Sequence, residues 1–141
     1  VFFKLRDRDK TRGVELARRL HQLGFRLLAT RGTAAGVRAA GLEVQSVFKV
    51  SEGRPNFVDL LKGGEVTLVV NTPEGRQQFF EEKEIRRTAV QHRIPIVTTL
   101  AAAAAAADAI AARAADSPSV HVLQQLHQQL AAAAPSVAHR A

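Results

Sequence analysis

The sequence predicts an α/β fold, a three-layer, doubly wound domain built on a five-stranded parallel sheet. Short apolar runs alternate regularly with segments of helical pattern along the 141 residues. This alternation is typical of a parallel sheet, because each parallel connection needs a crossover helix that covers one face. Ligands of such folds bind beyond the carboxyl ends of the strands, so the residues just after each strand are the candidates for a site.

The first strand is predicted over residues 1–5, and a helix follows over about residues 8–23. Leucines in this helix recur at i, i+4 and i+7, which places them on one face. Gly24 then occupies the position that commonly ends a helix. The second strand is predicted over residues 25–29.

The next two units repeat this pattern. Residues 33–40 have the length and alanine content of a short helix, and residues 43–49 alternate as a third strand. Pro55-Asn56 opens another helix, whose apolar residues share one face. Residues 66–71 are the most strand-like run, because they are rich in β-branched side chains.

The last units are less regular. Residues 74–80 have no clear period and are predicted to be a loop, which a helix over residues 82–91 and a fifth strand over residues 94–98 follow. The alanine-rich segment 100–115 is a strong helix former.

The domain organisation follows from the two ends. We expect residues 1–134 to form a single domain, with a helical segment from residue 120, and residues 135–141 to be a disordered tail. The chain opens on Val1, already inside a predicted strand. We therefore expect the native protein to continue upstream and this chain to be a fragment of it.

The composition argues against several classes of function. The absence of cysteine excludes disulfides and thiol nucleophiles, and the histidines show neither a metal-binding spacing nor a catalytic triad order. We therefore expect no catalytic residue and no metal site. The longest apolar run has about eight residues against the roughly 20 that span a bilayer, so we expect a soluble, cytoplasmic protein with no membrane partner.

The charge points to an anionic partner. The formal net charge is +7 and the isoelectric point is about 11.0, which suggests nucleic acid, a membrane surface or a small anionic ligand. Tyr and Trp are absent, and no block of five basic residues occurs. Stacked bases along a basic groove are therefore disfavoured, and we expect no nucleic-acid partner.

The turn Thr30-Arg31-Gly32-Thr33 after the second strand is the most informative candidate. Gly32 permits close approach of the backbone, Thr33 can cap the next helix, and the N-terminus of that helix presents free N–H groups. Together they describe a seat for a phosphate group. The alternative is an ordinary strand-to-helix turn with a capping threonine.

Three further polar residues lie at the same edge of the predicted sheet. Lys10 is in the first turn of a helix, where the dipole disfavours a cation by roughly 0.3–1 kcal/mol unless an anion compensates. That anion is either a ligand or the pair Asp7 and Asp9. Lys49 can neutralise a phosphate or protect a sheet edge, and Asn71 can contact a sugar or base or simply end its strand.

Several motifs occur in an order and spacing that one family shares. They are Arg6-Asp7-Arg8-Asp9-Lys10, Gly24-Phe25 with Ala29-Thr30-Arg31-Gly32-Thr33-Ala34, Lys49-Val50-Ser51-Glu52-Gly53-Arg54-Pro55-Asn56, Val70-Asn71-Thr72, Ile85-Arg86-Arg87 and Thr98-Thr99-Leu100. On these residues the chain resembles the allosteric domain of carbamoyl phosphate synthetase, which has the methylglyoxal synthase-like fold. The similarity runs from Val1 to about Leu130.

The resemblance implies the C-terminal regulatory domain of the large subunit of a glutamine-dependent ligase of arginine and pyrimidine biosynthesis. It implies a nucleotide monophosphate effector, typically UMP as inhibitor and IMP as activator, with ornithine as a further candidate. The implied effector-binding residues are Lys10, Thr30, Gly32, Thr33, Lys49, Asn71 and Thr72. No cofactor is expected in this domain, since ATP, Mg and K belong to the missing catalytic body. That body and the glutaminase small subunit are the implied partners.

Three positions depart from the bacterial pattern of the family. Lys4 replaces a serine, Phe48 replaces an asparagine, and Pro73 replaces a threonine. The resemblance therefore does not define which effector binds.

Two enzymes of the same fold are the alternatives. In methylglyoxal synthase the positions of Arg54 and Thr72 hold catalytic aspartates, and that of Arg6 holds a histidine. Without a carboxylate base the enolisation has no proton acceptor. The Lys-Thr-Leu-His-Pro stretch of the cyclohydrolase of purine synthesis is absent from this chain.

Phe79-Phe80 and the apolar face of residues 120–130 form a candidate contact surface. They can pack against the rest of the synthetase or against a second copy of the domain. The alternative is that both complete the local core.

Overall fold

Five short strands form one parallel sheet with the order β3-β2-β1-β4-β5. The computed structural model describes residues 1–73, 79–116, 122–125, 127 and 128. The strands are β1 (Phe2–Lys4), β2 (Leu28–Thr30), β3 (Gln45–Val47), β4 (Val69–Asn71) and β5 (Ile96–Val97). The sheet lies within the first of two compact units of the chain, Val1–Ala111.

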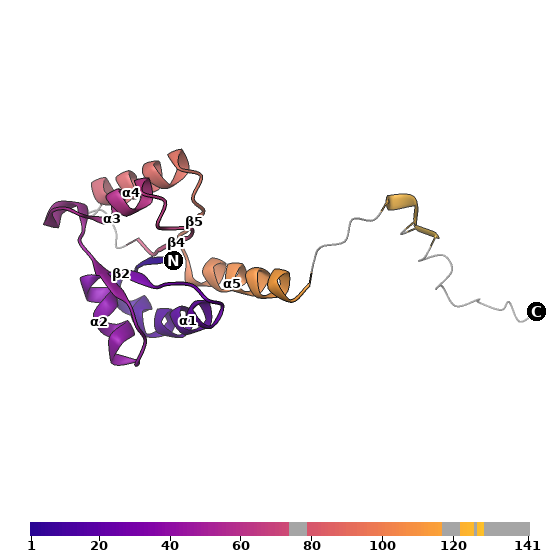
Figure 1. The fold of residues 1–141 in the computed structure, drawn as a ribbon, viewed down its shortest axis with the longest axis horizontal. Coiled ribbons are helices and arrows are strands. Elements are labelled where there is room, and N and C mark those ends of the chain that lie inside the picture. The colour runs from indigo at the N-terminus through magenta and orange to yellow at the C-terminus, as the bar shows by residue number, and fades with distance from the viewer. Residues whose placement is uncertain (74–78, 117–121, 126, 129–141) are drawn as a thin grey trace, which may run out of the picture. The chain divides into compact units, whose positions relative to one another are not determined.

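Helices connect the strands in regular alternation (Figure 1). They are α1 (Lys10–Gln22), α2 (Arg31–Ala39), α3 (Phe57–Lys62), α4 (Phe79–Gln91) and α5 (Leu100–Ala115), with short 3₁₀ turns η1 (Asp7–Asp9) and η2 (Val50–Glu52). No helix in the described part of the chain combines the length and the apolarity needed to cross a bilayer.

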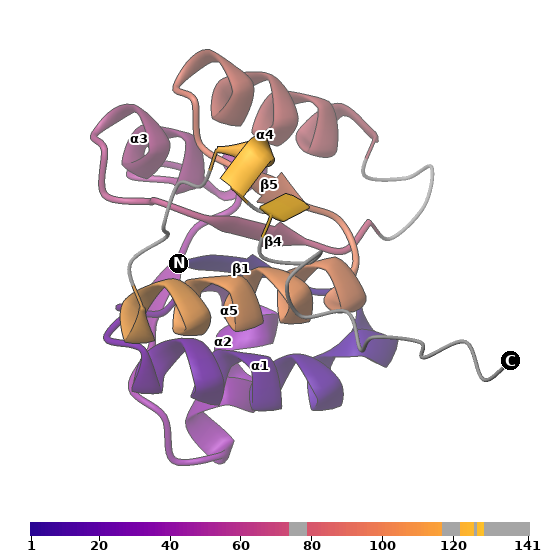
Figure 2. The ribbon, with the colours of Figure 1, turned by 90° about the vertical axis from the view of Figure 1, so that its right-hand side faces the viewer.

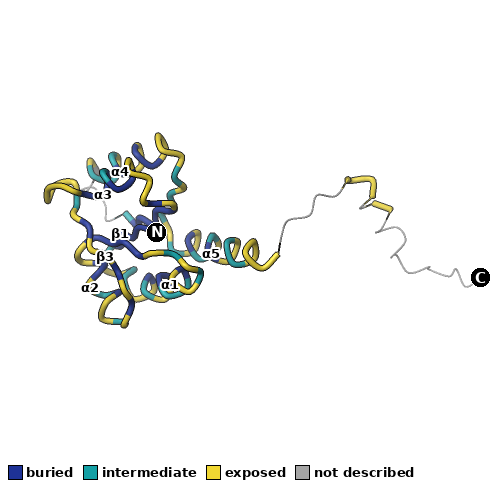
Figure 3. Tube along the Cα trace, viewed as in Figure 1, coloured by how far each residue is buried: buried dark blue, intermediate teal, exposed yellow. Residues whose placement is uncertain are grey.

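Helices cover both faces of the sheet. Successive strand residues point to opposite sides, so apolar strand residues on each face pack against helices. Phe2 packs into a cluster with α3 and α4, whereas Phe3 packs into a cluster with α1, α2 and α5. Figure 2 shows α3 and α4 on one side of β1 and β4 and α1 on the other. The three central strands, β1, β2 and β4, are buried between these layers, whereas the edge strands β3 and β5 are more exposed (Figure 3). The predicted three-layer, five-stranded parallel fold is confirmed.

The observed elements differ from the predicted ones mainly at their ends. Each strand is shorter than its apolar run, because only part of each run pairs with a neighbour. The predicted loop over residues 74–80 is wrong for Phe79 and Phe80, which begin α4. Glutamates in the first turn of α4 favour a helix start there through the dipole, a signal independent of apolar period.

Predictions for the C-terminal part fall largely on residues that the structure does not describe. The tail 135–141 and most of segment 120–134 lie outside the described residues. In the second unit, Ala112–Ala141, the side chains of Val122 and Leu123 are exposed. The contact surface predicted for this segment and for Phe79-Phe80 stays a prediction.

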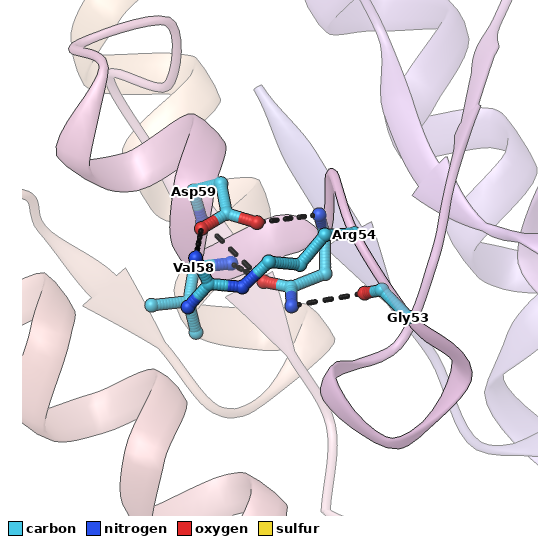
Figure 4. Close-up of polar contacts among 5 residues, drawn as sticks. Gly53, Arg54, Val58 and Asp59 are labelled. Atoms are coloured by element: carbon cyan, nitrogen blue, oxygen red, sulfur yellow. Dashed lines mark hydrogen bonds and ion pairs between the residues drawn. The ribbon is translucent and has the colours of Figure 1, made fainter.

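Helix ends follow the local signals in the sequence. Gly24 ends α1 with φ of +88°, as predicted. Asn56 caps α3, since its side-chain oxygen accepts hydrogen bonds from the amides of Val58 and Asp59, and the Asp59 carboxylate accepts one from the Asn56 amide (Figure 4). This reciprocal arrangement is a capping box, which fixes the start of α3. The Asn56 side-chain amide also donates to the carbonyl of Gly53, the residue after η2, at 3.0 Å.

Arg93 ends α4 in a backbone conformation that suits glycine. Its φ is +55°, and the amide of Ile94 bonds back to the carbonyl of Ala89 at 2.8 Å. A left-handed non-glycine residue costs about 1–2 kcal/mol. We expect Arg93→Gly to stabilise the fold by about 1 kcal/mol in urea unfolding. Arg86→Gly is the matched control, because the same exchange at an exposed position inside α4 should lower the stability by about 1 kcal/mol. A loss of stability in Arg93→Gly as well would contradict the prediction.

Candidate functional site

The site is expected where the winding of the sheet reverses. The chain builds β2 and β3 on one side of β1 and then crosses to place β4 and β5 on the other. The carboxyl ends of β1 and β4 meet at this reversal. There the amide of Thr72 donates to the Lys4 carbonyl, and the amide of Arg6 donates to Thr72 Oγ1, both at 3.0 Å. The hydroxyl of Thr72 therefore ties the two strand ends together.

The turn after β2 is built differently from the prediction. Thr30 is the N-cap of α2, and the helix begins at Arg31, so Thr33 does not cap it. Thr33 Oγ1 instead accepts a hydrogen bond from the amide of Leu5 at 3.1 Å and lies 3.4 Å from Thr30 Oγ1. The helix starts two residues earlier than expected, which turns this hydroxyl toward the end of β1. The first amides of α2 have no side-chain cap from Thr30.

Lys10 reaches across to this turn from the first position of α1. A Cβ built on Gly32 would lie 3.3 Å from Lys10 Nζ, which is a tight contact. The absence of a side chain at Gly32 therefore allows the ammonium group to lie close to the start of α2. Lys10 Nζ also lies 2.6 Å from Asp7 Oδ1. The hydrogen bond from Lys10, and then its charge, lower the pKa of Asp7. Of the two acids considered as compensating groups for Lys10, Asp7 pairs with it, whereas Asp9 pairs with Arg6. Compensation by a ligand stays a prediction.

Arg6 and Asp9 form the border of this cluster. Arg6 Nε lies 2.6 Å from Asp9 Oδ2. Desolvation is the largest influence on Asp9 and raises its pKa, but hydrogen bonds from Arg6 and Thr72 and the nearby arginine charges outweigh it, so the pKa is lowered. Asp9 is thus held as an anion by Arg6, and Asp7 is the acidic partner of the Lys10 ammonium.

A cleft of about 700 Å³ lies between η2 and α4. Its lining includes Lys49, Ser51, Glu81, Lys83, Glu84 and Arg87. In the described part of the chain Lys49 makes no hydrogen bond or ion pair with the other six predicted site residues. The structure therefore gathers Lys10, Thr30, Gly32 and Thr33 in one cluster and puts Lys49 in the cleft.

A row of buried polar residues lies between the cluster around Lys10 and the cleft. The pairings Phe3–Ala29 and Lys4–Asn71 bring Thr30, Lys4 and Asn71 side by side on three neighbouring strands. All three are buried. Lys4 Nζ lies 2.9 Å from Glu81 Oε2 at the start of α4. Glu81 was not a predicted site residue, and no local signal could have found it, since its partner is 77 positions away.

Phe48, which also departs from the family pattern, lies near Arg31 of the turn after β2. The Arg31 guanidinium is 5.9 Å from the centre of the Phe48 ring, and it lies 3.8 Å from a carboxylate oxygen of Glu52. Arg54 approaches Asp59 at 3.8 Å (Figure 4). Among the described residues no group of three or more acidic or histidine side chains is arranged to hold a metal ion.

Most of the sheet and its turns match a known family of domains. The model of the MGS-like domain matches residues 12–98, which include the turn after β2, the cleft segment η2 and the end of β4. The chain belongs to the MGS-like domain family. The match contains six of the seven predicted site residues, and only Lys10 lies just before it.

Similar proteins include large chains of carbamoyl phosphate synthase. The carbamoyl phosphate synthase large chain of Acidobacterium capsulatum is 51% identical over 127 residues, and that of Gemmatimonas aurantiaca is 47% identical over 132 residues. The C-terminal section of the large chain from Methanopyrus kandleri is 48% identical over 123 residues. These alignments cover 90%, 94% and 86% of this chain but only 12%, 12% and 23% of those relatives.

Proposed function

We propose that this chain is the effector-binding regulatory domain of a carbamoyl phosphate synthetase large subunit. It binds a nucleotide monophosphate of the UMP or IMP type and passes the signal to the synthetase body. The position of the Lys10 ammonium over Gly32 carries the proposal, because it assembles a cation, two hydroxyls and a helix N-terminus at one sheet edge. The similarity to large chains over most of this chain supports the assignment.

The phosphate is bound by the cluster of Lys10, Thr30, Gly32 and Thr33. Lys10 exchanges its contact with the exposed Asp7 for one with the phosphate, and the amides at the start of α2 donate to the remaining oxygens. Asn71 and Thr72 contact the sugar or base, and Lys49 contributes charge from the cleft. Charge-assisted hydrogen bonds of about 1.5–3 kcal/mol each are sufficient for micromolar affinity.

Regulation requires that the effector bind one state of the full protein more tightly than the other. Two partners respond to this difference in effector affinity. They are the catalytic body, which binds ATP, Mg and K, and the glutaminase subunit. The full-length protein is a cytoplasmic ligase in this proposal, and this chain has no catalytic activity alone. Ornithine is a weaker candidate ligand, since the cluster around Lys10 is built for an anion.

The structure gives no support to a methylglyoxal synthase activity. Arg54, at the position of one catalytic aspartate, lies beside Asp59, and Thr72, at the position of the other, accepts a hydrogen bond from the Arg6 amide. Neither residue can act as a carboxylate base. Turnover of dihydroxyacetone phosphate by the chain would contradict the regulatory assignment.

Calorimetric titration of UMP, IMP and ornithine tests the proposal. We expect Lys10→Ala to weaken nucleotide binding roughly 10- to 100-fold, because it removes one charge-assisted bond to phosphate. Arg12→Ala is the matched control, since it removes the same charge from the exposed first turn of α1 and should change affinity less than twofold. Equal nucleotide affinities of wild type and Lys10→Ala would rule out this placement of the phosphate.

A further inference from the structure

Two buried polar side chains, Lys4 and Asn71, lie on the side of the sheet that α4 covers, where Lys4 meets the largely buried Glu81 of the first turn of α4. Val69 of β4 packs against α3 and α4 and Val70 packs against the other layer, so Asn71 points to the α4 side. The same alternation in β1 turns Lys4 to that side, where it meets Glu81. Lys4 and Asn71 are register partners on adjacent strands. Lys4, Asn71 and Glu81 therefore form one group, called here the Lys4 cluster.

The hydrogen-bonding capacity of the Lys4 cluster is not used up. Asn71 Oδ1 and Glu81 Oε1 are buried and accept no hydrogen bond from any residue that the structure describes. Lys4 Nζ lies 2.9 Å from Glu81 Oε2 but makes no further hydrogen bond with any described residue. Asn71 is only 2% exposed. Buried polar atoms without partners are costly, so the cluster is suited to a group that supplies donors.

The chemistry of these atoms narrows the choice of ligand group. Two acceptors and one ammonium group lie together, which disfavours a second phosphate because it would supply only acceptors. An ammonium group of a ligand would face the charge of Lys4. Neighbouring hydroxyl groups both donate and accept, so they satisfy Asn71, Glu81 and Lys4 at once. Glu81 also lines the cleft, which gives a ligand access to it.

We propose that the Lys4 cluster is a hydroxyl-binding subsite that contacts the vicinal 2′ and 3′ hydroxyls of a ribonucleotide, with Glu81 as the contact residue. Lys4 is a positioning residue that holds the Glu81 carboxylate through their ion pair. The inference rests on the proposed nucleotide function and adds its sugar specificity. The chain then distinguishes ribonucleotides from 2′-deoxyribonucleotides.

Calorimetry with UMP, 2′-deoxy-UMP and inorganic phosphate on the 141-residue chain tests this subsite. We expect the wild type to bind UMP about tenfold more tightly than 2′-deoxy-UMP, the factor that one hydrogen bond to a charged group supports. Glu81→Gln should bring the two nucleotides within about twofold of each other and leave phosphate affinity unchanged. Glu84→Gln is the matched control, because Glu84 lines the same cleft one turn further along α4.

A double variant protects the test against simple misfolding. Lys4→Met with Glu81→Leu removes both charges of the pair, and it should retain phosphate binding while losing the preference for UMP. Nearly equal affinity of the wild type for the two nucleotides, or a preference that survives in Glu81→Gln, overturns the subsite while leaving nucleotide binding intact. Failure of UMP to bind at all overturns the proposed function as well, so the two failures are distinguishable.

Discussion

Phe57→Ala is expected to lower the free energy of unfolding by about 3–5 kcal/mol. Phe57 is 1% exposed and its ring stacks on that of Phe2, with the ring centres 3.9 Å apart. The pair joins α3 to the central strand of the sheet, so the truncation leaves a cavity in the layer that includes α4. Aromatic stacking adds about 0.5–1.5 kcal/mol to the burial of these rings.

Urea unfolding followed by circular dichroism measures this loss. Phe80→Ala is the matched control, because Phe80 is 85% exposed and the same truncation removes little buried surface. We expect the control to change the free energy by less than about 0.5 kcal/mol. A loss below 1 kcal/mol at Phe57 would mean that α3 closes over the cavity and that the stacked pair is not a centre of the core.

The order of elements could be predicted from the sequence because its signals are local. Leucines spaced on one face predicted α1, and Gly24 marked its end, which the left-handed φ of that glycine confirms. Pro55-Asn56 likewise indicated the start of α3, where the structure has Asn56 as the N-cap. The start of α4 at Phe79 was missed, because the evidence for it is the charge of its first turn and not an apolar repeat.

The details of the candidate site were harder to predict because they depend on distant segments. Thr33 has the chemistry of a cap, but the end of β1 supplies a donor to its hydroxyl that no spacing rule reveals. Lys4 was recognised as a departure from the family pattern, yet its partner on α4 was not. Such pairs form only when the sheet register and the helix layer are both fixed. The roles assigned to Lys10, Lys49 and Asn71 stay predictions that ligand binding must test.

Glu81→Leu is expected to lower the free energy of unfolding by about 2–3 kcal/mol. The substitution leaves the buried ammonium of Lys4 without its carboxylate, and breaking a buried pair in this way costs about 3–5 kcal/mol when both groups are fully enclosed. The Glu81 side chain is 15% exposed and that of Lys4 is 8% exposed, so some solvent access reduces the penalty.

The double variant Lys4→Met with Glu81→Leu should recover most of that loss, because apolar side chains of similar size replace the pair without leaving a buried charge. A double-mutant cycle in urea then measures a coupling of about 1–3 kcal/mol between the two positions. Additive effects would show that the ion pair does not hold α4 to the end of β1. Coupling without any change in nucleotide selectivity would instead separate a purely structural pair from the hydroxyl-binding subsite.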